Sequence, residues 1–148
     1  MNCLGIDWGE KRIGLSFGDA LGLAVPISAA VEATEAARFE HIQSVISDRE
    51  IKRLVVGMPY NMNGSTGFKA KEVKGFIEKL KTRFDLPIST VDERLTSHQV
   101  EQQLKAQNRK FDRRSGEVDS RAASLILQDY LDQSLGQNLE IPRDEDES

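Results

Sequence analysis

Apolar and polar positions along the chain predict three strands followed by alternating helices and strands. Residues 2–7 form a short apolar run. Residues 11–17 alternate apolar and polar side chains, the period of two that is typical of a half-buried strand, and residues 9–11 between the two favour a tight hairpin. A weaker third strand is predicted at 22–27, where Pro26 favours the edge of a sheet. The chain therefore begins as an antiparallel sheet.

The remaining pattern alternates helical spacing with short β-branched runs. Strands are predicted at 53–57 and 86–91. Helices are predicted at 34–50, after the loop at 57–67 as far as about residue 84, from 96 onward, and at about 118–135. Three antiparallel strands followed by this alternation predict an α/β domain with a mixed five-stranded sheet and helices on both of its faces. This is the outline of the ribonuclease H-like fold, although other α/β sandwiches share it.

Length and composition fit one domain. The 148 residues are 39% hydrophobic and 30% charged, as in globular proteins. No apolar run approaches the roughly 20 residues that cross a bilayer, and the N-terminus has no signal-peptide pattern, so we expect a cytoplasmic protein without a membrane partner. Cys3 is the single cysteine, which excludes an intrachain disulfide and argues against a thiolate metal site. We place the domain at 1–135 and an acidic, disordered tail at 136–148.

The net charge of −4 reflects the end of the chain. The last nine residues hold one of the 20 bases and five of the 24 acids, so 19 of each remain before them. Two basic clusters stand out within this balanced part. They are Lys69, Lys71, Lys74, Lys79, Lys81 and Arg83, and then Lys105, Arg109, Lys110, Arg113 and Arg114. The first is equally well explained as a solvated helix face, whereas the second lies in a stretch with few apolar residues and favours contact with a phosphate-bearing substrate.

Carboxylates stand in three places where a predicted element begins or ends. Asp7 follows the first strand, Asp92 and Glu93 follow the strand at 86–91, and Asp119 opens the last helix. The carboxyl ends of neighbouring strands meet in the crevice where α/β proteins bind ligands. Alternation puts Asp92 and Glu93 on opposite faces, so we expect only one of them in this crevice and Asp92 pointing away. Oxygen ligands suit Mg²⁺ or Mn²⁺, the ions that assist phosphoryl transfer.

Each carboxylate also has a simpler explanation. A turn position, or an ion pair with Lys11 or Arg12, explains Asp7 equally well. The residues 92–94 are equally an exposed turn with local ion pairs, and the helix dipole favours Asp119 where it stands. Against this, an aspartate in an apolar strand is costly to bury without a partner, and the alanines three and four residues after Asp119 share its helical face.

The loop at 57–67, GMPYNMNGSTG, is rich in glycine and asparagine. It lacks the Gly-Lys-Ser/Thr sequence of a Walker A motif. Asn61 and Ser65 can donate hydrogen bonds to a nucleic-acid backbone, and a polar rim without direct contacts explains them equally well. Trp8 and Tyr60 can stack on a base, although single aromatic residues more often belong to a core or a rim.

Four segments together resemble the YqgF/RuvX family of bacterial ribonuclease H-like nucleases. They are GIDWGEKRIGLSFGD, VVGMPYNMNGSTG, VDERLT and VDSRAASLILQDYL. The resemblance covers residue 2 to about 132, and four ordered motifs with compatible spacing are highly specific. It implies a metal-dependent endonuclease that uses Mg²⁺ or Mn²⁺ and matures the 5′ end of the 16S rRNA precursor. Branched DNA is the alternative substrate, because the family was first linked to Holliday-junction resolution by its likeness to RuvC. We expect a monomer or a weak homodimer.

Carried over residue by residue, the acids of the family fall on Asp7, Glu93 and Asp119. The resemblance implies that these are catalytic and hold two metal ions, with Asp7 between them. The family loop GxP…G…S falls on Gly57, Pro59, Gly64 and Ser65. RuvC carries a further acid near its last one, where this chain has Ser120 and Arg121, which weakens the implication of junction resolution. We predict nucleic-acid contacts at Arg12, Asn61, Ser65, Arg94, Arg109, Lys110, Arg113 and Arg114.

Two other classes of function stay open. The segment DWGEKRIG also resembles the first phosphate loop of actin-like ATPases and sugar kinases, which share the core fold but enclose their nucleotide with a second lobe. A non-catalytic nucleic-acid-binding module would use the basic surface alone. Titration with ATP, compared with metal-dependent cleavage of structured RNA, separates these possibilities from a nuclease.

Overall fold

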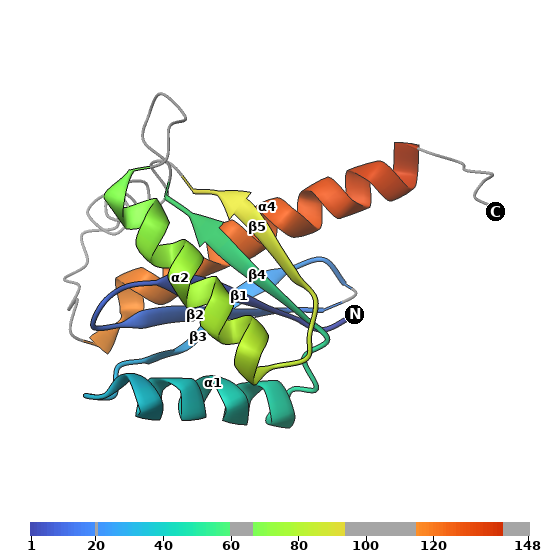
Figure 1. The fold of residues 1–148 in the computed structure, drawn as a ribbon. Helices are drawn as coiled ribbons and strands as arrows, with labels where there is room; N and C mark the ends of the chain where they lie inside the picture. Colours follow the sequence, from blue (N-terminus) through green and yellow to red (C-terminus); the bar gives the residue numbers. More distant parts are fainter. Residues whose placement is uncertain (20, 60–66, 94–114, 141–148) are drawn as a thin grey trace, which may run out of the picture.

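The computed structural model describes residues 1–19, 21–59, 67–93 and 115–140, which form one mixed sheet covered by helices on both faces (Figure 1). The strands are β1 (Cys3–Trp8), β2 (Ile13–Gly18), β3 (Ala24–Ala30), β4 (Arg53–Met58) and β5 (Ile88–Asp92), and the helices are α1 (Glu35–Asp48), α2 (Phe68–Arg83) and α4 (Glu117–Glu140). The strand order is β3-β2-β1-β4-β5. The first three strands are antiparallel, while β4 runs parallel to β1 and to β5. The predicted sheet is thus confirmed. None of the helices in these ranges is long and apolar enough to cross a membrane.

Alternation along the strands divides the core into two layers. Leu4 and Ile6 of β1 pack with Phe39 of α1 and Phe76 of α2, whereas Cys3 and its neighbours on the opposite face pack against α4. The central parallel strands are buried on both faces, which explains their continuous apolar runs. On β1, the residues at odd positions face α4, and Asp7 is one of them.

Small residues let α4 lie very close to the sheet. Ala122 and Ala123 are fully buried, and they lie over a sheet face that carries Gly5 and Gly14. A Cβ atom at Gly14 would overlap the backbone carbonyl of Asp119, and one at Gly5 would lie 2.9 Å from the carbonyl oxygen of Ala123. The start of α4 therefore rests directly on β1 and β2, and this contact sets the position of Asp119.

Two elements differ from their predicted bounds. The third strand is Ala24–Ala30 rather than 22–27. It lies at the edge of the sheet, as Pro26 predicts, and an edge strand continues past a proline because the missing N–H faces away from its neighbour.

The last helix ends at Glu140 rather than at about 135, so the first residues of the predicted tail are helical. Gln137, Leu139 and Glu140 are good helix formers, and a glycine inside a helix costs only about 1 kcal/mol. The boundary between the domain and the tail stays a prediction. The helix predicted from 96 onward lies outside the described residues.

Candidate active site

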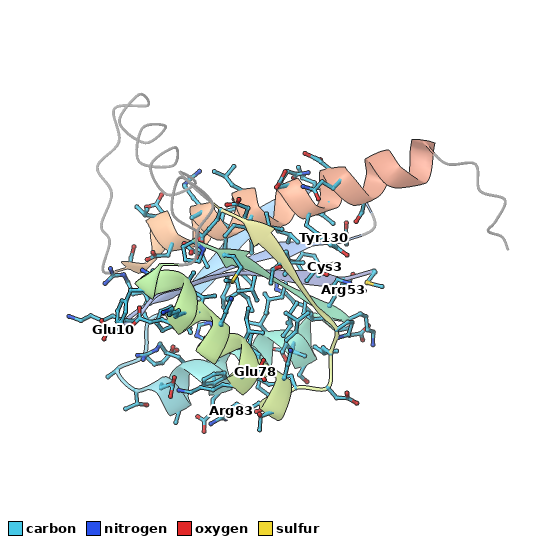
Figure 2. The ribbon with its side chains drawn as sticks, turned by 45° about the horizontal axis from the view of Figure 1, so that its top comes forward. Cys3, Glu10, Arg53, Glu78, Arg83 and Tyr130 are labelled. Atoms are coloured by element: carbon cyan, nitrogen blue, oxygen red, sulfur yellow. The ribbon has the colours of Figure 1, made fainter. Side chains whose placement is uncertain are left out.

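The carboxyl ends of β1, β4 and β5 meet the starts of α2 and α4 at one end of the molecule (Figure 1). Figure 2 shows Glu10, in the loop after β1, at this end and Arg53, where β4 begins, at the other. A cavity of about 340 Å³ opens here. Its lining residues are Asp7, Trp8, Gly9, Glu10, Lys11, Arg12, Pro59, Lys69, Glu93 and Asp119. The structure therefore brings together the three carboxylates that the sequence singles out.

Asp7 and Glu93 form a buried pair of carboxyl groups. They are 8% and 9% exposed and are joined by a side-chain hydrogen bond. The backbone N–H of Glu93 donates to the Met58 carbonyl at 3.1 Å, which fixes the residue beyond the end of β5. Burial, together with the nearby charges of Glu93 and Asp119, raises the pKa of Asp7 well above its ordinary value. Burial also raises the pKa of Glu93 to about 7. Near neutral pH the pair therefore keeps a proton unless a cation replaces it.

Asp119 is held by an arginine from the loop between β1 and β2. Arg12 Nε donates to Asp119 Oδ2 at 3.1 Å. Arg12 therefore pairs with Asp119, 107 residues away in the chain, and not with Asp7, the partner that the sequence left open. The negative charge of Asp119 still acts on Asp7, since it contributes to the raised pKa of that group.

The donor set fits a divalent cation of the Mg²⁺ type. All the acidic ligands offer oxygen, and a cation displaces the proton that a buried carboxyl pair otherwise retains. Within the described ranges, no three His, Cys, Asp or Glu side chains already surround one metal position. Asp7 and Glu93 are adjacent, and both offer carboxylate oxygens to an ion once their shared proton has left. Asp119 lines the same cavity, with Arg12 as its partner.

Asp92 lies on the other face of β5, as alternation predicts. Its side chain is exposed and does not line the cavity, whereas that of Glu93 does. The two residues that follow Asp119 have structural partners. Ser120 Oγ accepts a hydrogen bond from the backbone N–H of Leu15 at 3.2 Å, and Arg121 pairs with Glu117 at 3.5 Å. Ser120 thus helps to hold α4 on β2.

Lys69 is a cavity residue to which the sequence analysis gave no role of its own. It lies in the first turn of α2, and its positive charge opposes the raised pKa values of both Asp7 and Glu93. The sequence grouped it with other exposed lysines that lie away from the cavity, such as Lys79, which pairs with Glu35 at 2.8 Å across helices. The available signal was its position at a helix start directly after the glycine-rich loop.

Trp8 lines the cavity and packs on Phe76, with 6.0 Å between the ring centroids. Several predicted nucleic-acid contacts lie outside the described residues and stay predictions. They are Asn61, Ser65, Arg94, Arg109, Lys110, Arg113 and Arg114.

Comparison with known proteins shows the family of this chain. A family model described as "RuvX: Holliday junction resolvase" matches residues 1–133. A relative from Opitutus terrae is 47% identical over 134 residues, which cover 90% of this chain and 92% of the relative. One from Gloeothece citriformis is 45% identical over 131 residues, covering 88% and 87%. Both bear the name "Putative pre-16S rRNA nuclease".

Among solved structures, Thermus thermophilus RuvC in complex with a Holliday junction substrate is similar with a TM-score of 0.55. The match covers 92% of this chain and 96% of RuvC at 17% identity, a likeness that shows the ribonuclease H-like fold alone. Family membership rests instead on the sequence relatives and the family model. By these matches, the chain belongs to the RuvX family.

Proposed function

We propose that this protein is a metal-dependent nuclease that hydrolyses phosphodiester bonds at the 5′ end of the 16S rRNA precursor in the cytoplasm. The buried pair of Asp7 and Glu93, with Asp119 in the same cavity, carries the proposal. Buried acids that repel one another destabilise a fold, and they are typical of sites that bind cations or catalyse reactions. The names of the relatives from Opitutus terrae and Gloeothece citriformis support RNA as the substrate.

In this proposal Asp7, Glu93 and Asp119 hold Mg²⁺ or Mn²⁺. Such ions, when bound, lower the pKa of water and stabilise negative charge on the leaving oxygen. Asp7 and Glu93 release their shared proton to become ligands. Lys69 is placed to attract the phosphate from the α2 side of the cavity. Arg12, which is only partly buried, can exchange its pairing with Asp119 for a phosphate oxygen and so free that carboxylate.

Branched DNA is the second candidate substrate, because the family model is described as a Holliday junction resolvase. The resemblance to RuvC implies a further acid near the last one, but Ser120, next to Asp119 in this chain, binds the backbone of β2. This difference favours the RNA proposal.

The test compares Asp7→Asn with Asp92→Asn on a 5′-extended 16S rRNA precursor and on a four-way DNA junction, each with Mg²⁺ or Mn²⁺. Both substitutions remove one charge at constant size, but Asp92 faces away from the cavity. We expect wild type and Asp92→Asn to cleave the RNA and Asp7→Asn to lose at least about 100-fold, the upper end of what losing a supporting contact costs. Cleavage by Asp7→Asn at the wild-type rate overturns the mechanism. Cleavage of the junction but not of the RNA transfers the proposal to DNA, and binding of ATP without any cleavage replaces it with a nucleotide-binding function.

A further inference from the structure

A second cavity adjoins the candidate active site at the loop between β1 and β2. It has a volume of about 310 Å³ and is lined by Lys11, Arg12, Val31, Glu32, Ala33 and Arg38. Lys11 and Arg12 line both cavities. The two cavities therefore meet at this loop.

Arg38 of α1 holds its guanidinium group at this second cavity in a fixed position. Its Nη1 donates to the backbone carbonyl of Glu32 at 2.6 Å, and its Nη2 donates to that of Glu10 at 3.2 Å. Carbonyl oxygens are neutral, so these bonds orient the group without cancelling its charge. Among the ion pairs of the described residues none includes Arg38, although the hydrogen bond to His41, together with the charge of Arg38, lowers the pKa of the Glu32 carboxyl group. A guanidinium has five N–H donors, so donors remain for an anion.

The two cavities differ in their balance of charge. The second has the cations Lys11, Arg12 and Arg38 against the carboxylates of Glu32 and of Asp119, the partner of Arg12. Glu32 Oε2 is bonded to His41 Nδ1 at 2.8 Å, and its Oε1 is buried without a hydrogen-bond partner. The second cavity thus has a cationic excess.

The first cavity has no excess of cations. Its acids are Asp7, Glu10, Glu93 and Asp119, and its bases are Lys11, Arg12 and Lys69. Because Asp7 and Glu93 keep one proton between them, these charges balance until a cation replaces that proton, whereas the excess of cations in the second cavity attracts an anion.

We propose that the second cavity is a phosphate subsite, in which Arg38 and Lys11 bind the phosphate next to the one that is cleaved in the same nucleic-acid strand. The proposal rests on the proposed function, because the strand is the one held at the carboxylates. Arginine binds phosphate through two parallel hydrogen bonds, and a lysine adds a mobile point charge. Because the carbonyls of Glu32 and Glu10 already orient Arg38, little side-chain entropy is lost on binding.

The test measures binding of a structured precursor RNA in EDTA, where metal-dependent cleavage is blocked, across a series of salt concentrations. The full-length variants are Lys11→Gln, Arg38→Gln and Arg38→Lys. Lys52→Gln is the matched control, since Lys52 is an exposed residue next to Arg53 at the opposite end of the sheet (Figure 2). Each lost phosphate contact reduces the slope of log K against log salt by about 0.7 for a single strand, which is about a fivefold loss of affinity at 0.1 M relative to 1 M salt.

We expect this reduced slope for Lys11→Gln and Arg38→Gln, and the wild-type slope for Lys52→Gln. Arg38→Lys separates a phosphate contact from a brace between loops. Lysine keeps the positive charge, so if Arg38 contacts a phosphate, Arg38→Lys keeps the wild-type salt slope. If Arg38 only holds the loops together through its two carbonyl bonds, Arg38→Lys and Arg38→Gln both lower the melting temperature and leave the salt slope unchanged. This second outcome overturns the proposal.

Cleavage of the same RNA by the wild type with Mg²⁺ or Mn²⁺ is measured in parallel. If the wild type binds and cleaves while Lys11→Gln and Arg38→Gln keep its salt slope, the subsite is wrong and the proposed function stands. If the wild type neither binds nor cleaves the RNA, the proposed function fails, and the subsite fails with it.

Discussion

The burial of Glu93 predicts that Glu93→Gln stabilises the metal-free protein at high pH. Burial raises the pKa of this carboxyl group from 4.5 to about 7. Because each pH unit corresponds to about 1.4 kcal/mol, ionising Glu93 costs about 3 kcal/mol more in the folded protein than in the unfolded chain. Glutamine keeps the size of the side chain and has no charge to bury.

The sign of the pH dependence follows from linkage. The folded protein binds the proton of Glu93 more tightly than the unfolded chain does, so this contribution to stability is complete below pH 4.5. It is lost as the pH rises from 4.5 to about 7. The raised pKa of Asp7 acts in the same direction. Glu93→Gln should therefore match the wild type near pH 4.5 and exceed it by about 3 kcal/mol at pH 8, which corresponds to roughly 10 °C in melting temperature.

The assay is urea unfolding in EDTA between pH 4.5 and pH 8, with Glu40→Gln as the control for removing an exposed glutamate from α1. Addition of Mn²⁺ should stabilise the wild type by mass action and have much less effect on Glu93→Gln, which lacks one proposed ligand. Equal pH dependence of the wild type and Glu93→Gln in EDTA would refute the reasoning, because Glu93 would then ionise as freely in the folded protein as in water.

Two further predictions concern the position of α4 and the binding of substrate. Gly14→Ala should lower the free energy of unfolding by about 3 kcal/mol and reduce cleavage, because the new Cβ overlaps the backbone of Asp119. The control Gly75→Ala, in open space on α2, should raise the free energy of unfolding by up to about 1 kcal/mol. An unchanged free energy for Gly14→Ala in urea unfolding would contradict the close packing. Replacing Arg113 and Arg114 together with glutamine should weaken RNA binding and reduce its salt slope by about 1.4 while leaving stabilisation by Mn²⁺ intact. Filter binding at several salt concentrations tests this, and an unchanged slope contradicts it.

The sequence alone determined the sheet and the three acids at its end. The period of two along 11–17 and the apolar run at 53–57 are local patterns, and a strand needs only its own residues to display them. The alternation that separates Asp92 from Glu93 is equally local, because successive side chains in a strand point to opposite faces. Pro26 likewise predicted an edge strand from its missing N–H.

The tertiary structure alone decided which charges meet. Arg12 pairs with Asp119, and Lys69 joins the acids from the start of α2. These partners come from segments far apart in the chain, and their distances depend on the strand order and on how closely α4 approaches β2. That approach is possible because Gly14 has no side chain. The reason for a glycine at this position appears only in the folded structure, where the Asp119 carbonyl lies against it. Local pattern selects the elements, whereas the charges that face one another are selected by packing between elements.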